Sequence, residues 1–328
     1  MSISSTFRIF ALTLFVSSCF ATSADQITYA EDAVKKSTKD KKEDEFPTID
    51  VVTKDYEEIK SEDGKKTFFK LWKNDDTGRV LARLPKNYAS SSARQFIAPT
   101  VSGGELFAGL QSDDFYVYWR RYGKRLALMQ ENLSIKGSDE ESKSSVDRLF
   151  TDKVLLDVPI LTMDANSPVI DLTTLLVENA RVFFGRDISP QRELVSISEA
   201  KAYPKNVEIA YEVPMRSGNL KTIHYSISEI KGSEGFKPRV ADQRIGYFLT
   251  SYLDYGKYES DETSIRYINR WHLEKRDDKL KISPPKKPIV FYIEHTTPVR
   301  YRRWVREGIL SWNKAFEQIG ISLSLIHI

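Results

Sequence analysis

Cysteine is almost absent from this chain of 328 residues, in which Cys19 is the only one. A single cysteine cannot form an intrachain disulfide. If an N-terminal leader is removed after Ala24, the mature chain has no thiol at all, so neither a disulfide scaffold nor a thiol nucleophile is expected. A hydrophobic core must then stabilise the fold, and a composition of 41% hydrophobic and 29% charged residues is sufficient for one.

An excess of charge of one sign is lacking too. Lysine and arginine total 49 against 46 acidic residues, which gives a net charge of +3. Proteins that bind nucleic acid usually concentrate positive charge on one surface, so this balance argues against a nucleic-acid partner. A local cluster at Arg300, Arg302, Arg303 and Arg306 is interpreted as the solvated side of a helix.

Long hydrophobic runs are missing as well. The apolar stretch at residues 9–16 (IFALTLFV) is far shorter than the roughly 20 residues that span a bilayer, so no transmembrane span is expected. Arg8 precedes this stretch and small residues follow it at 22–24, which is the pattern of an export signal. We predict a signal peptide over residues 1–24, cleaved after Ala24, and an exported protein of the periplasm, the outer membrane or the extracellular space.

The sequence leaves two forms of the N-terminus open. Residues 16–19 (VSSC) resemble a loose bacterial lipobox, in which Cys19 would be lipidated and would anchor the protein as an outer-membrane lipoprotein. In the alternative, Cys19 is only a small residue within an ordinary signal peptide. A lipid anchor is therefore expected in the first case and absent in the second.

Composition divides the rest of the chain into several parts. Residues 25–45 are charged and lack apolar spacing, which predicts a disordered tether. Residues 46–98 are expected to form a small N-terminal β module, and residues 99–282 a larger β-rich domain. Residues 283–288 (SPPKKP) are predicted to be a linker, because clustered prolines prevent regular strand pairing.

Apolar alternation and turn residues predict antiparallel pairing in both β parts. Segments at 154–161 and 169–176 are apolar but broken by prolines, so they are expected to be strands or short helices. The predicted hairpins join residues 67–72 to 79–84, 115–121 to 125–130, and 207–213 to 220–227.

A different pattern begins after the linker. Residues 289–293 (IVFYI) have the composition of a short buried strand. Thr297 and Pro298 supply a cap and a first-turn proline, and Gly320 supplies a stop, so one helix is predicted between them. The predicted fold class is α+β, with mostly antiparallel strands up to about residue 280. The apolar side of the helix consists of Tyr301, Trp304, Val305, Ile309, Trp312, Phe316 and Ile319.

Known catalytic motifs are also lacking. The helical motif His-Glu-x-x-His would supply two zinc ligands from one face. His295 follows Glu294, but position 299, where a second histidine would be needed, is Val299. The sequence has no phosphate-binding loop, dinucleotide fingerprint or serine-hydrolase elbow. We therefore assign no catalytic residue and no metal ligand, and we expect no cofactor to bind this chain. The histidines, all interpreted as strand or loop residues, are His224, His272, His295 and His327.

Several motifs together resemble a known family. Residues 288–320 (PIVFYIEHTTPVRYRRWVREGILSWNKAFEQIG) are similar to the opening of the catalytic domain in secreted bacterial zinc-dependent metalloproteases, which are metzincin-like and carry N-terminal domains of unknown function. Upstream stretches match the same family in the same order, so the resemblance covers roughly residues 46–320. These stretches are Phe46-Pro47 with Asp50, residues 202–208 (AYPKNVE), 239–248 (RVADQRIGYF) and 267–275 (YINRWHLEK).

The resemblance implies that residues 289–322 are the first strand and helix of a zincin-like domain. In that family the zinc site lies further downstream, in a motif that has no counterpart here. The full-length protein would then bind zinc and cleave protein or peptide substrates, and this chain would be an inactive N-terminal fragment. Residues 323–328 (LSLIHI) match one reading frame of a sequencing-library transposon end, so they are expected to be an adapter artefact, the alternative being an edge strand. The other functional alternative is a non-enzymatic exported β-rich module that binds a peptide, glycan or protein.

Asp242 and Arg244 are the two residues of the family-like stretch at 239–248 with a candidate role. Carboxylate oxygen is a zinc ligand, so Asp242 could hold the cleft of an unprocessed peptidase shut. The alternative interpretation is structural: Asp242 and Arg244 cap a turn or form an ion pair beside a strand, and the segment docks against its surroundings.

Overall fold

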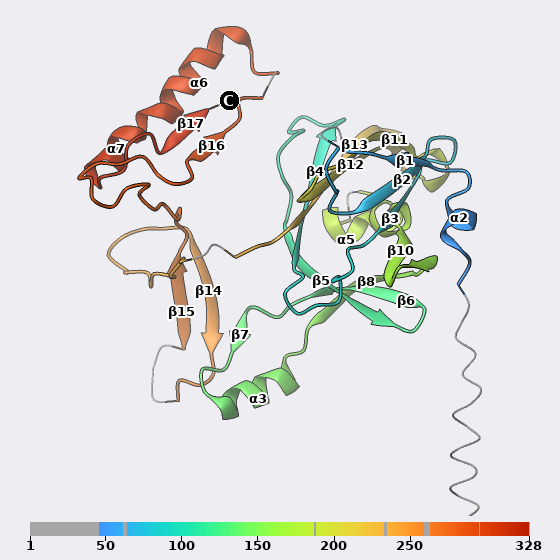
Figure 1. Ribbon diagram of the computed structural model, residues 1–328, viewed down its shortest axis with the longest axis horizontal. Coiled ribbons are helices and arrows are strands. Elements are labelled where there is room, and N and C mark those ends of the chain that lie inside the picture. The colour runs from blue at the N-terminus through green and yellow to red at the C-terminus, as the bar shows by residue number, and fades with distance from the viewer. Residues whose placement is uncertain are drawn as a thin grey trace, which may run out of the picture. The chain divides into compact units, whose positions relative to one another are not determined.

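The computed structural model describes residues 46–61, 64–186, 188–232, 235–258, 263–294 and 296–327, and of residues 325–327 it describes the backbone only. Contacts divide the chain into residues 1–46 and 47–328, and the second unit is drawn in colour in Figure 1. The predicted signal peptide, its cleavage site at Ala24, Cys19 and the tether at 25–45 lie outside the described residues.

The first sheet has five antiparallel strands. Its central hairpin is the predicted one, and it turns at Gly78, whose φ is +63°. The first strand of this hairpin begins later than predicted, because the amide of Phe68 donates to the carbonyl of Tyr203 instead of pairing within the hairpin. In order across the sheet, the strands are β1 (Glu57–Ile59), β2 (Lys70–Asn74), β3 (Arg79–Arg83), β10 (Ser167–Asp171) and β9 (Thr162–Asp164).

The second sheet has seven strands, and every neighbouring pair in it is antiparallel. The predicted hairpins of β12 with β13 and of β5 with β6 are confirmed. In order across the sheet, the strands are β11 (Ser196–Ala202), β12 (Asn206–Pro214), β13 (Leu220–Glu229), β4 (Gln95–Gly103), β5 (Phe115–Tyr122), β6 (Arg125–Gln130) and β8 (Lys153–Pro159) (Figure 1).

The main core lies on one face of the seven-stranded sheet. Alternate residues of β12 and β13 are buried, as the period of two along a strand requires. Two short helices cover this face, α4 (Leu172–Leu176) and α5 (Ala180–Phe184). The ring of Phe183 on α5 packs edge-on against Tyr225, and the Tyr225 hydroxyl donates to the carbonyl of Leu176 over 2.7 Å. Aromatic packing and one buried hydrogen bond therefore hold the helices on the sheet.

Smaller elements complete the described region. Helix α3 begins with a capping box, in which the Asp139 carboxylate accepts from the amide of Ser142 and the Ser142 side chain contacts the amide of Asp139. These elements are α2 (Ile49–Val52), β7 (Ile135–Lys136), α3 (Glu140–Leu149), a 3₁₀ turn at Arg192–Leu194, β14 (Leu249–Asp254) and β15 (Ser264–Ile268). Strand β14 pairs antiparallel with β15 and parallel with β7.

The C-terminal elements differ from the sequence prediction in one respect. The predicted single helix is two helices, α6 (Val299–Ser311) and α7 (Asn313–Gln318). They meet at Trp312, whose amide bonds to Ile309 three residues back, a tighter turn than the α-helical one. The N-cap position falls on Pro298 and lacks a side-chain cap, so Thr297 does not act as predicted. Gly320 has a φ of +85°, consistent with its predicted role as a stop.

Strand pairing does not follow the expected domain boundaries. Strand β4 crosses residue 98, and β9 and β10 join the sheet that β1–β3 begin. The predicted linker at 283–288 has no regular strand, but Lys275 bridges to Pro285 and Ser283 bridges to Ile321. Strand β16 (Ile289–Phe291) pairs in parallel with β17 (Leu325–His327). The origin of residues 323–328 as an adapter artefact stays a prediction.

The predicted fold class is confirmed: the described residues form an α+β structure in which antiparallel strands dominate. A strand and helices also follow residue 288, as predicted. No helix among the described residues is long and apolar enough to cross a membrane.

Two glycines in hairpin turns allow a test of the packing between chain segments. Gly78 and Gly123 both have positive φ, but a Cβ on Gly78 would lie 2.3 Å from the carbonyl oxygen of Val195, whereas nothing lies within 4 Å of the corresponding position at Gly123. We expect Gly123→Ala to lower the free energy of unfolding by about 1 kcal/mol through backbone strain alone. Gly78→Ala should cost at least about 2 kcal/mol more, since the backbone near Val195 must move. Urea denaturation of both variants measures the difference, and equal losses would contradict the close approach.

Candidate functional site

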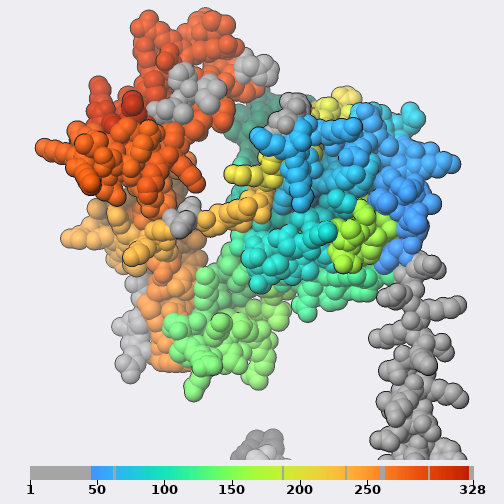
Figure 2. Space-filling view, viewed as in Figure 1, coloured from blue at the N-terminus to red at the C-terminus, as the bar shows by residue number. Residues whose placement is uncertain are grey.

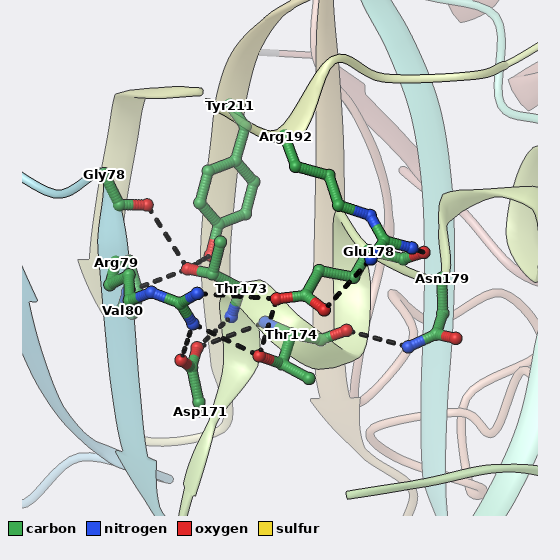
Figure 3. A network of polar contacts seen from close by, with 10 residues as sticks. All are labelled: Gly78, Arg79, Val80, Asp171, Thr173, Thr174, Glu178, Asn179, Arg192 and Tyr211. Atoms are coloured by element: carbon green, nitrogen blue, oxygen red, sulfur yellow. Dashed lines mark hydrogen bonds and ion pairs between the residues drawn. The ribbon is translucent and has the colours of Figure 1, made fainter. Parts of the chain in front are cut away.

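A network of polar side chains surrounds Asp171, where β10 ends and α4 begins (Figure 3). The Asp171 carboxylate accepts from the amides of Thr173 and Thr174 over 2.8 and 3.1 Å, which caps the helix. The guanidinium of Arg79, from β3, forms an ion pair with the other carboxylate oxygen. Asp171 is 8% exposed, so its charge is compensated almost entirely by the protein.

The hydroxyl of Thr173 connects this cluster to both sheets. It accepts a hydrogen bond from the amide of Val80, on β3 of the five-stranded sheet, over 2.9 Å. Its oxygen lies 3.3 Å from the carbonyl of Gly78, in the turn between β2 and β3. It also lies 3.1 Å from the hydroxyl of Tyr211, on β12 of the seven-stranded sheet. A single buried hydroxyl therefore joins the two sheets.

Glu178 adds a second carboxylate to the network. Its side chain lies 3.5 Å from the guanidinium of Arg79 and 3.6 Å from that of Arg192, and it accepts from the hydroxyl of Thr174 over 3.0 Å. Two cations and two carboxylates thus alternate in the cluster. Figure 3 shows these side chains directed toward one another, with Tyr211 above them.

The charge states of this network are set by its internal partners. Burial lowers the pKa of Arg79, but Asp171 and Glu178 raise it by more, so the pKa stays above its ordinary value. Burial raises the pKa of Tyr211, with Asp171 contributing in the same direction. Both groups keep their proton at neutral pH and are already bonded within the protein. We interpret the network as a structural connection and assign no proton-transfer role to it.

The structure places Asp242 and Arg244 together in an exposed turn. The Asp242 carboxylate accepts from the backbone amide of Arg244 over 3.0 Å and from its guanidinium over 2.9 and 2.6 Å. The amide of Ile245 bonds to the carbonyl of Asp242, which closes the turn. The Arg244 side chain holds the pKa of Asp242 below its usual range. These contacts agree with the turn and ion-pair interpretation, while the inhibitory role stays a prediction.

The same turn borders an open depression of about 490 Å³. On one side, the amide of Ala241 donates to the carbonyl of Arg266 on β15. Neighbouring Phe248 is 89% exposed. The segment that resembles the protease family therefore presents an apolar ring beside a shallow, mixed-polarity hollow.

A second polar group lies on the seven-stranded sheet. The carboxylate of Glu208 on β12 accepts from Asn206 and Ser226 over 2.6 and 2.7 Å, and its other oxygen lies 3.0 Å from Nε2 of His224. Burial raises the pKa of Glu208, but these three neighbours outweigh it, so the pKa lies below its ordinary value. Ser226 donates to the carboxylate rather than to the imidazole, so the arrangement does not activate a serine nucleophile.

Zinc does not fit the described residues. In the part of the chain that the structure describes, no three His, Cys, Asp or Glu side chains come together as a possible metal site. His224 and His272 each lie near one glutamate, at 3.0 and 3.5 Å. His295 and the side chain of His327 lie outside the described residues. We therefore derive no metal-dependent step for this chain.

Sequence reasoning did not identify the Asp171 network. One local signal was present: Asp171 precedes the helical stretch LTTLL, and aspartate is a preferred N-cap residue. The partners of Asp171 gave no such signal, because Arg79 lies 92 residues away and meets it only after β3 and β10 have paired.

Substitution of Asp171 tests its structural role. Asp171→Ala removes the helix cap and leaves Arg79 without its nearest carboxylate, so we expect the free energy of unfolding to fall by about 2–4 kcal/mol. Asp171→Asn keeps a capping oxygen and should lose less. The matched control is Asp157→Ala, which breaks the ion pair between Asp157 and Arg125. The side chains of these two residues are 45% and 54% exposed, so the loss should be less than about 1 kcal/mol. Equal losses in chemical denaturation at positions 171 and 157 would contradict this assignment.

Comparison with known proteins identifies one family. A family model described as a domain of unknown function (DUF5117) matches residues 109–276, which is just over half of the chain. The matched range includes β5 to β15, and with them Asp171, Glu208 and Asp242. No curated protein and no solved structure gives a significant match. The chain belongs to the family of proteins that contain the domain of unknown function DUF5117.

Proposed function

We propose that residues 46–322 are the N-terminal, non-catalytic part of an exported zinc-dependent metallopeptidase that acts on proteins or peptides. The observation that carries the proposal is the apolar side of α6 and α7, most of which is exposed to solvent, with Ile309 and Phe316 partly buried. Trp304, Trp312 and Ile319 are 63%, 65% and 67% exposed, and Figure 2 shows the surface of this orange-to-red segment. An amphipathic helix ordinarily buries such a side against another element, so a further part of the same domain would cover it.

The motif resemblance supports the same proposal. A proline-led strand, a threonine-proline step, a helix and a closing glycine follow one another in the family pattern, and the chain has β16, residues 297–298, α6 with α7, and Gly320 in this order. Zinc would be held by residues that are not in this sequence. The residues described here would support that catalytic part without taking part in the reaction. Export to the periplasm, the outer membrane or the extracellular space belongs to the proposal, with a lipid anchor only if Cys19 is modified.

The intact genomic reading frame tests this proposal. We expect it to continue beyond Gly320 into a His-Glu-x-x-His motif, and its purified product to contain one zinc ion and to hydrolyse peptides. Replacement of the motif glutamate by glutamine should abolish hydrolysis while zinc remains bound, because that glutamate acts as general base on a bound water. A frame without the motif would overturn the proposal. If the purified region then retained a peptide, glycan or protein, the non-enzymatic binding module would take its place.

Asp242→Ala, made in the intact enzyme, tests the inhibitory role of this residue. If Asp242 holds the cleft shut, the variant should raise the peptidase activity of the unprocessed enzyme without lowering its melting temperature. The matched control is Asp277→Ala, because Asp277 makes the same kind of turn by accepting from the amide of Lys279 over 2.9 Å. Unchanged activity, or an equal rise in both variants, would leave Asp242 as a turn residue.

A further inference from the structure

An open groove of about 710 Å³ lies beside the five-stranded sheet. Its walls are the end of β1, residues 64–68 with the start of β2, and the end of β3 with the following residues 84–87. Figure 2 shows the surface of this part of the chain in blue to cyan. Grooves of this volume are large enough to bury most of a small ligand.

The lining of the groove is strongly cationic. Glu58 is the one acidic side chain among its described lining residues. Glu62 and Asp63 belong to the same loop in the sequence but lie outside the described residues. Even when both are counted, cations outnumber acidic residues two to one. The cationic lining residues are Lys60, Lys65, Lys66, Lys70, Arg83 and Lys86.

Ion pairs within the protein neutralise only some of these cations. Lys70 pairs with Glu58 over 2.8 Å, and Arg83 pairs with Asp164. Lys60, Lys66 and Lys86 form no ion pair within the described ranges. Like charges that face one concave surface repel one another and raise the local potential, so an anion that enters the groove relieves this repulsion.

The chemistry of the lining favours phosphate. A lysine ammonium is a compact point charge with three N–H donors, and it binds phosphate oxygens without requiring a planar partner. Thr67, Ser167 and Asn87 add hydroxyl and amide groups, and Phe68 adds an aromatic ring against which the carbon skeleton of a ligand could pack. Three ammonium groups without ion pairs require more than one anionic group for neutralisation.

We propose that this groove is a binding site for a small, multiply phosphorylated molecule, held by Lys60, Lys66 and Lys86. The site is separate from the Asp171 network and from the turn at Asp242, and it does not depend on peptidase activity. The phosphate groups could belong to a soluble ligand or to a lipid headgroup, which present the same chemistry.

Titration calorimetry of the chain with tripolyphosphate tests the soluble form. We expect binding that weakens as salt rises to about 0.15 M, since the Debye length then shortens to about 8 Å. The triple variant Lys60→Gln, Lys66→Gln, Lys86→Gln should bind at least about tenfold more weakly. The matched control also removes three positive charges, but outside the groove, and should bind like the parent chain. Its substitutions are Lys143→Gln, Lys153→Gln and Lys257→Gln.

Flotation with vesicles tests the lipid form. If the ligand is a headgroup, vesicles of phosphatidylcholine with phosphatidylinositol bisphosphate should float together with the parent chain and the control variant, and pure phosphatidylcholine vesicles should float with neither. Binding in either assay that depends on Lys60, Lys66 and Lys86 supports the site. Flotation assigns the phosphate to a lipid headgroup, and binding of tripolyphosphate without flotation assigns it to a soluble ligand. Absence of binding in both assays, or equal losses in the two triple variants, overturns the proposal. The unfolding midpoint of each variant, measured in urea, confirms that a loss of binding reflects the groove and not the fold.

Discussion

The ion pair between Arg79 and Asp171 is the contact on which much of the described structure depends. Asp171 ends β10, caps α4 and neutralises a cation from β3, so one carboxylate sets the positions of three elements. The next residue but one, Thr173, extends the connection to Tyr211 in the second sheet. Because Asp171 and Tyr211 are buried, loss of any partner would leave a polar group without water to replace it, and such groups are costly.

This arrangement also determines the surface nearby. Strand β10 pairs with β3, and β3 carries Arg83 into the wall of the cationic groove. Ser167, at the opposite end of β10 from Asp171, lines the same groove. The buried side of the sheet is therefore neutralised by internal carboxylates, whereas the groove retains lysines that no described carboxylate neutralises. Arg79 is thus paired with carboxylates beside the core, whereas three of the groove lysines form no ion pair within the described ranges and lie where an anionic ligand can bind.

Local elements could be predicted from the sequence because their signals are local. The hairpins of β2 with β3, β5 with β6 and β12 with β13 each have turn residues between alternating apolar segments, and all three are present. The helical pattern after residue 298 was also correct in kind. The break at Trp312 was not predictable, because the apolar spacing continues through it and only the backbone hydrogen bonds change. The turn at Asp242 was also predictable, because aspartate carboxylates commonly accept from the backbone amide two residues later, here that of Arg244.

The order of strands in the sheets was beyond the reach of the sequence. Strand β10 joins β3 across more than eighty residues, and β13 pairs with β4 across more than a hundred, so neither pairing leaves a short-range pattern. The sequence by itself determined the antiparallel β-rich class, the hairpins and the presence of a helical segment, because these follow from turn chemistry and from the period of apolar residues. Only the tertiary structure decided that Asp171 meets Arg79, that one hydroxyl joins two sheets and that scattered lysines face one groove, because each depends on which distant strands lie side by side.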